Sequence, residues 1–104
     1  MDVTRIEELC EEIHEEIKTL ESMTGITAPF TVDLEARVVT FGEDSFKIKE
    51  RFLEKYLEIR LERFKIMVKM AESTGDREKL EKLINLNNNL VMAAVLCYET
   101  KEDE

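Results

Sequence analysis

The sequence has few residues that interrupt helices and few that carry redox or metal chemistry. Its 104 residues include one proline, three glycines, two cysteines and one histidine, and glutamine is absent. Scarce glycine and proline favour long helices, and two cysteines are too few for a disulfide framework. The longest unbroken apolar run, residues 90–98, is far shorter than the roughly 20 residues that span a bilayer. The N-terminus lacks a basic stretch followed by an apolar core, so we expect neither a secretory signal nor a membrane span.

Charge is abundant and unevenly distributed. Charged residues make up 38% of the chain, whose formal net charge is −9. Residues 1–24 hold eight acids against two bases, a net of −6, and residues 99–104 hold four acids against one base, a net of −3. Because no predicted face carries a basic cluster, we expect no direct binding to nucleic acid. The hydrophobic fraction of 43% predicts one folded domain, residues 1–104, ending in a frayed acidic tail at 99–104.

The longest periodic segment, residues 44–99, is predicted to be an antiparallel helical hairpin. Its first arm, residues 44 to about 73, carries two neighbouring apolar rows at spacings of three and four. These rows are Leu53, Leu57, Leu61, Phe64, Val68 and Ala71, and beside them Phe52, Tyr56, Ile59, Ile66 and Met70. Gly75 and Asp76 predict a left-handed helix end and a new N-cap, so the second arm should run from about 77 to 98. Residues 90–98 would be apolar on every face, which is typical of a helix buried in a bundle or against another subunit.

The first helix is predicted to be held by a narrow apolar seam. Residues at alternating spacings of three and four form this seam, namely Val3, Ile6, Cys10, Ile13, Ile17 and Leu20, with only Leu9 and Met23 beside it. The rest of the helix is mostly glutamate, which repels itself at spacing four. We expect this helix to dock along a basic row, Lys47, Arg51 and Lys55, on the long helix.

Between the helices, residues 30–41 are rich in β-branched and aromatic side chains. We predict a β-hairpin with strands at 30–33 and 37–41 and a turn at 34–36. An alternative pairs residues 38–41 with 46–49, but we favour helix from residue 44, because Phe46 and Ile48 continue the two apolar rows. The predicted fold class is therefore mainly α, a three-helix bundle with a small β-hairpin insert.

Two overlapping Glu-Glu-x-x-Glu motifs occur in the first helix. Their residues are Glu7, Glu8 and Glu11, then Glu11, Glu12 and Glu15. The motif resembles the Mg²⁺-binding half-site of the all-helical nucleoside triphosphate pyrophosphatases, which a Glu-x-x-Asp on a later helix completes. No aspartate in this chain has a glutamate three positions before it. We therefore interpret the motifs as a solvated acidic face.

The cysteines and the histidine are weak candidates for chemistry. Cys10 and His14 are four residues apart and could chelate zinc together with Cys97, but these three side chains alone do not close a site. Both cysteines fall on apolar helical rows, which predicts buried free thiols in a reducing cytoplasm. Acidic neighbours would also raise the pKa of the Cys10 thiol, which argues against a Cys–His nucleophile. We expect no metal, no cofactor and no catalytic residue.

The least ordinary feature is that all four asparagines, Asn85, Asn87, Asn88 and Asn89, lie within five residues of a predicted helix. Asparagine is a mediocre helix former and its carboxamide needs hydrogen-bond partners. One interpretation is a polar contact that fixes register or oligomeric state. The other is a ligand or partner site, completed by Arg60 or Arg63, which interrupt the apolar rows of the facing arm.

These patterns together favour a non-enzymatic, acidic, helical interaction protein of the cytoplasm. It would act as a homodimer or higher homo-oligomer, as an adaptor or regulatory binding module, with itself and a basic protein surface as partners. A metal-dependent nucleotide hydrolase using the first-helix glutamates is one alternative. An acidic decoy that occupies a nucleic-acid-binding site on another protein is a second. The high charge and missing glutamine are also typical of heat-adapted proteins.

Overall fold

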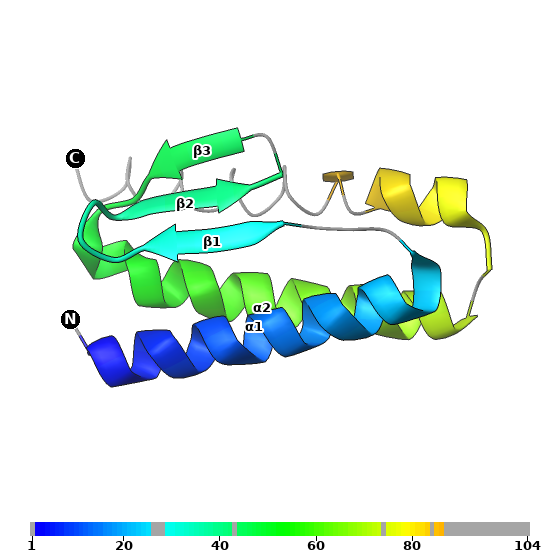
Figure 1. The fold of residues 1–104 in the computed structure, drawn as a ribbon, viewed down its shortest axis with the longest axis horizontal. Coiled ribbons are helices and arrows are strands. Elements are labelled where there is room, and N and C mark those ends of the chain that lie inside the picture. Colours follow the sequence, from blue (N-terminus) through cyan, green and yellow to red (C-terminus); the bar gives the residue numbers. More distant parts are fainter. Residues whose placement is uncertain (1, 26–28, 43, 74, 84, 87–104) are drawn as a thin grey trace.

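The computed structural model describes residues 2–25, 29–42, 44–73, 75–83 and 85–86. Helix α1 spans Val3–Thr24 and helix α2 spans Glu50–Ser73. Strands β1, Phe30–Asp33, β2, Val38–Phe41, and β3, Asp44–Lys47, lie between the two helices in sequence. Residues 77–83 and 85–86 are also helical. The chain is thus mainly helical with a small antiparallel sheet, as predicted (Figure 1).

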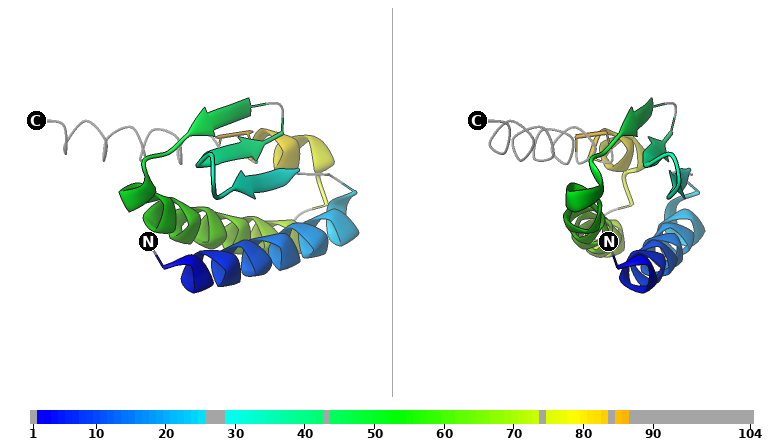
Figure 2. Two further views of the ribbon diagram at one scale, coloured as in Figure 1. Left: turned by 60° about the vertical axis from the view of Figure 1, so that its left-hand side comes forward. Right: turned by 90° about the vertical axis from the view of Figure 1, so that its left-hand side faces the viewer.

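The elements form two layers. Helices α1 and α2 pack along each other in one layer, and the sheet lies over them. The helical residues 77–83 continue the sheet's layer beyond the strands (Figures 1 and 2). Both long helices run in the same direction, because three strands return the chain to the end at which α1 began (Figure 1). The second arm of the predicted hairpin beyond residue 86 lies outside the described residues, so the complete three-helix bundle stays a prediction.

Local signals fix both ends of α1. The side chain of Asp2 accepts a hydrogen bond from the Arg5 amide at 3.1 Å, as an N-cap does. At the other end Gly25 adopts a left-handed conformation, φ 73°, and its amide donates to the Glu21 carbonyl oxygen at 2.7 Å. Helix α1 therefore ends at Gly25.

The buried stripe of α1 differs from the predicted seam. Its fully or nearly fully buried residues are Ile6, Leu9, Ile13, Ile17 and Leu20. Leu9 replaces Cys10, which is only half-buried, and Val3 remains 44% exposed. The buried stripe is rotated toward Leu9 and away from Val3 and Cys10, because Leu9 lies beside α2, where it lines the groove between the two helices.

The sheet contains three antiparallel strands in the order β1-β2-β3. Phe30 lies opposite Phe41 in the first ladder, and Phe41 lies opposite Asp44 in the second. The predicted hairpin of residues 30–33 and 37–41 is confirmed, with its turn held by Asp33 Oδ1, which accepts from the Ala36 amide at 3.0 Å.

Strand β3 corrects the prediction of helix from residue 44. Residues 44–47 pair with β2, and α2 begins six residues later than predicted, at Glu50. Only two residues separate Phe41 from Asp44, and Gly42 has the positive φ, 63°, that such tight hairpin turns require. The alternative pairing of 46–49 with 38–41 had the right strand partner but a register two residues too late.

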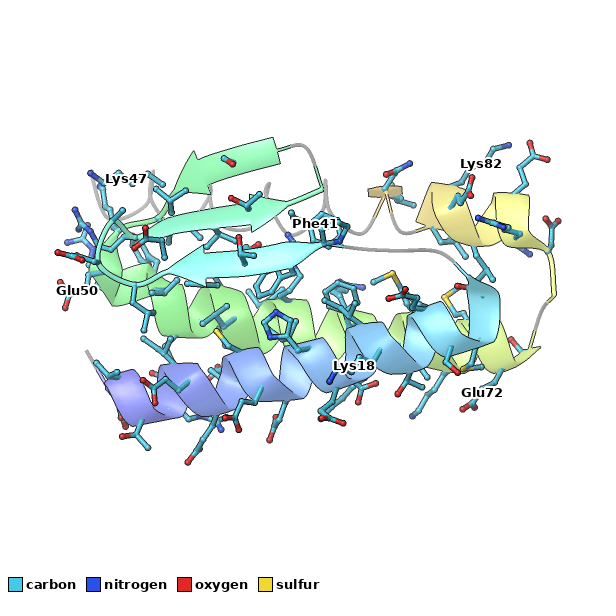
Figure 3. The ribbon with its side chains drawn as sticks, in the orientation of Figure 1. Lys18, Phe41, Lys47, Glu50, Glu72 and Lys82 are labelled. Atoms are coloured by element: carbon cyan, nitrogen blue, oxygen red, sulfur yellow. The ribbon has the colours of Figure 1, made fainter. Side chains whose placement is uncertain are left out.

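This correction removes the predicted basic row. Lys47 lies in the sheet layer, whereas Glu50 already belongs to α2 (Figure 3). Lys47 therefore does not share a helix face with Arg51 and Lys55. Lys55 instead forms an ion pair within its own helix, with Glu58 at 3.9 Å.

The predicted N-cap of the next helix is confirmed, but Gly75 lacks the positive φ that a left-handed helix end requires; among the described glycines, Gly25 and Gly42 have it. Asp76 Oδ1 accepts a hydrogen bond from the Lys79 amide at 3.1 Å, which is an N-cap contact. Leu80, one turn later, is buried in the core between the layers. Predicted features at residues 87–98, including the all-apolar segment, lie outside the described residues.

Candidate functional site

The most unusual described side chain is Arg60, which is 0% exposed in the middle of α2 and is the one charged residue buried in the part of the chain that the structure describes. Its Nε and Nη2 donate hydrogen bonds to the hydroxyl oxygen of Tyr56 at 3.1 and 2.8 Å. The guanidinium carbon also lies 4.6 Å from the ring centre of Phe41, a residue at the end of β2 (Figure 3). We call Phe41, Tyr56 and Arg60 the arginine cluster.

Helix geometry and side-chain chemistry explain why the arginine cluster forms. Tyr56 and Arg60 are four residues apart and so share a face of α2. A guanidinium is planar and weakly hydrated, and it stacks on aromatic rings, so it tolerates burial better than an ammonium group. The cluster therefore joins the sheet to α2 through one cation shared by two aromatic side chains.

The cluster also sets the protonation of Tyr56. Burial raises the pKa of the Tyr56 hydroxyl above its ordinary value, and the charge of Arg60 and its hydrogen bond offset part of that rise. The hydroxyl therefore stays neutral at physiological pH. This arrangement suits a structural hydrogen bond better than acid–base catalysis, which needs a pKa near the operating pH.

Of the other predicted site residues, the structure describes Arg63 and Asn85. Arg63, one turn beyond Arg60, is half-buried, and Asn85 is exposed on the helical residues 85–86. Asn87, Asn88 and Asn89 lie outside the described residues. A single site that contains these asparagines and the two arginines stays a prediction.

His14 has a definite structural role at the edge of the sheet. Its Nε2 donates to the carbonyl oxygen of Phe30 at 2.8 Å, and the two rings meet edge to face at 5.9 Å. The Gly42 amide donates to Pro29, so the next pair, Phe30 and Phe41, is a non-hydrogen-bonded one and the Phe30 carbonyl points away from β2. His14 therefore ties the outer edge of β1 to α1.

Cys10 is a free, half-buried thiol. Burial raises the pKa of the Cys10 thiol, and the nearby charge of Glu7 raises it further. The thiol is therefore a poor nucleophile at neutral pH. Cys97 lies outside the described residues.

The Glu-Glu-x-x-Glu motifs form an acidic face on the outside of α1. Five of its glutamates are exposed, namely Glu7, Glu8, Glu11, Glu12 and Glu15. Within the described part of the chain, no three histidine, cysteine or carboxylate side chains come together as a potential metal site.

A shallow groove of about 190 Å³ lies between α1 and α2. Its lining residues are Arg5, Leu9, Glu58, Leu61, Glu62 and Lys65. Small-molecule sites usually enclose about 300 to 1,000 Å³. The groove is therefore small, with charges of both signs around two apolar side chains.

The second apolar row of α2 is covered only in part. Phe52 and Tyr56, near the start of the helix, are buried. The rest of that row, together with the arginine that interrupts it, forms what we call the outer row: Ile59, Arg63, Ile66 and Met70. Ile66 is 37% exposed, and the other three are half-buried. In the end view of Figure 2, α1 lies beside one flank of α2, and no described element covers the opposite flank.

Comparisons with family models, with curated proteins and with solved structures find no match for this chain. None of the helices among the described residues combines the length and apolar character needed to cross a membrane.

Proposed function

We propose that this chain is a non-enzymatic interaction protein that acts as a homo-oligomer, in the simplest case a homodimer. The observation that carries the proposal is the outer row of α2, where Ile66 remains 37% exposed between two half-buried neighbours, Arg63 and Met70. Leu86, in the following helical segment, is 53% exposed. An apolar row that the described elements cover only in part is the kind of surface that interfaces bury.

The sequence gives a second reason for assembly. Residues 90–98 are predicted to be apolar on every helical face, and such a segment needs neighbours on all sides. A chain of 104 residues has limited surface with which to provide them. A second copy supplies that surface by symmetry, because the same patch serves on both subunits.

Light scattering over a range of protein concentrations tests the proposal. We expect a species of about twice the 12.2 kDa chain mass, with a thermal unfolding midpoint that rises with concentration, because dissociation and unfolding are linked. A species of single-chain mass at high concentration would overturn the proposal.

The asparagines provide a sharper test of the interface. We propose that Asn87 or Asn88 lies near the two-fold axis, where carboxamides of the two copies hydrogen-bond to each other. Asn87→Leu and Asn88→Leu should then change the stoichiometry or the stability of the dimer, as loss of a polar register residue does in coiled coils. If both variants leave the dimer unchanged, the ligand-site interpretation of residues 85–89 is preferred.

An activity assay tests the non-enzymatic part. With no Glu-x-x-Asp in the sequence to complete a carboxylate site, we expect no hydrolysis of nucleoside triphosphates with Mg²⁺ or Mn²⁺. Release of phosphate or pyrophosphate that disappears in Glu11→Gln and Glu12→Gln would favour the hydrolase instead.

A further inference from the structure

The outer row has a symmetric spacing. Its four residues follow one another at intervals of four, three and four, so the row reads the same from either end. It covers about 16 Å of helix at 1.5 Å per residue. Two charged and exposed residues, Glu62 and Lys69, flank it on the same side, seven residues apart.

We infer that the outer row is a homodimer interface in which α2 of one copy packs antiparallel against α2 of the other. This inference rests on the proposed homo-oligomeric function and specifies its surface and orientation. The two-fold axis crosses α2 at the level between Phe64 and Lys65, the midpoint of the outer row. Ile59 then packs on the partner's Met70, and Arg63 packs on the partner's Ile66.

Charge favours the antiparallel orientation. The antiparallel orientation places Glu62 beside the partner's Lys69, and the two-fold symmetry repeats this attraction on the other side of the axis. Arg63, which packs on the partner's Ile66, also extends toward the partner's Glu62, one turn away from that Ile66. A parallel pair would instead bring the two copies of Arg63 together within the seam, where like charges repel.

The described elements leave this flank of α2 uncovered. Four residues of α2 line the groove beside α1, namely Glu58, Leu61, Glu62 and Lys65. At about 100° per residue, Glu62 is the member of this set nearest to the outer row. The outer row lies on the other side of α2, and Figure 2 shows no described element there. A second α2 can therefore approach without displacing α1 or the sheet.

The test reverses the two flanking charges separately and then mixes the variants. Glu62→Lys should place lysine against the partner's Lys69 twice per dimer, and Lys69→Glu should place glutamate against the partner's Glu62 twice. Each variant alone should dimerise about tenfold more weakly, on the order expected for two reversed surface pairs. An equimolar mixture should form a heterodimer of wild-type affinity, because both contacts then join opposite charges.

The mixture controls for effects within one chain. Glu62 also lines the groove beside α1, so Glu62→Lys changes contacts within its own chain as well. Those contacts are the same whether the variant is alone or in the mixture, so rescue in the mixture reports only on contacts between chains. Ile66→Glu should abolish dimerisation, whereas Met23→Glu, at an equally exposed apolar residue of α1, should not. Sedimentation equilibrium in low salt measures all of these species.

The outcomes separate this inference from the proposed function. A wild-type dimer that ignores both charge reversals and Ile66→Glu refutes the α2 interface but leaves homo-oligomerisation standing. Weakened single variants that the mixture fails to rescue refute the antiparallel orientation. A wild-type protein that is a monomer at all concentrations refutes both.

Discussion

Tyr56→Phe removes a single oxygen atom, yet we expect it to be among the most destabilising conservative changes in the chain. That oxygen accepts two hydrogen bonds from the buried guanidinium of Arg60. Hydrogen bonds to charged groups contribute about 1.5 to 3 kcal/mol, and a buried charge that loses its acceptor costs more. We therefore expect a loss of about 2 to 4 kcal/mol, a large part of the roughly 5 to 15 kcal/mol that stabilises a small domain.

Arg60→Met completes a double-mutant cycle. This variant removes the charge but leaves the buried Tyr56 hydroxyl without its two donors, which should cost about 1 to 3 kcal/mol. With both changes present, apolar groups of similar shape replace both partners. The double variant should then be little worse than either single one, which corresponds to a coupling of about 1.5 to 3 kcal/mol.

Urea unfolding followed by circular dichroism, at one fixed protein concentration, measures all four corners of the cycle. Arg77→Met is the matched control, because the Arg77 side chain is 64% exposed and pairs across one turn with Glu81. It should change stability by less than about 0.5 kcal/mol. A Tyr56→Phe variant as stable as wild type, or a strictly additive cycle, would refute the structural role of the arginine cluster.

Alkaline pH provides a second readout of the same contact. In the folded state, burial raises the pKa of Tyr56 by more than Arg60 lowers it. The unfolded state therefore loses this proton first as the pH rises. Stability from Tyr56 is therefore present in full below its unfolded pKa, about 10, and is lost as pH rises through the folded value. The difference in stability between wild type and Tyr56→Phe should accordingly shrink above pH 10.

Two further predictions concern α1. Ile13→Ala, at a fully buried residue, should cost about 2 to 5 kcal/mol in urea unfolding, whereas Glu12→Ala, at an exposed one, should be nearly neutral; equal losses would mean that the acidic face is itself buried in an assembly. In a Cys97→Ser background, the raised pKa of Cys10 should make its thiol react more slowly with an aromatic disulfide at pH 8 in native than in urea-unfolded protein. Equal rates in the two states would show that burial does not control this thiol.

Short-range signals in the sequence were sufficient for most element boundaries. The residues that cap α1 and the helix after Asp76 act within three or four positions of the groups they bind. The hairpin of β1 and β2 was equally local, since a turn closed by Asp33 joins two strands of four residues. Contacts of this kind depend on the identity of near neighbours and not on the rest of the fold.

Strand β3 was missed because a segment of four residues can satisfy two periodicities. Phe46 and Ile48 extend the apolar rows of α2, but the segment 45–48 also alternates polar and apolar residues with the period of a strand. Pairing with β2 decided between them: the Ile48 amide donates to the Arg37 carbonyl oxygen at 3.0 Å, across eleven positions. Gly42, suited to a two-residue turn, was the available signal.

The arginine cluster was predictable only in part. The sequence shows that Arg60 interrupts an apolar row and that Tyr56 is one turn before it. It does not show that Phe41 lies against the guanidinium, because that contact depends on the register of β2 and on how the sheet lies over α2. A charged residue within an apolar row therefore indicated an unusual environment, but the identity of its neighbours required the fold.

The same third strand determines which part of α2 remains available to a partner. An odd number of strands brings the chain back to the end where α1 begins, so the two long helices run parallel and α1 covers one flank of α2 throughout (Figure 1). The sheet covers a second side, through Phe41 against Phe64 at 5.8 Å. The apolar sector of α2 is wider than these two elements can cover, so Ile66, at the edge of that sector, remains exposed. The width of that sector is visible in the sequence, whereas the parallel arrangement of the helices that leaves its edge uncovered is not; assembly through that edge stays a prediction.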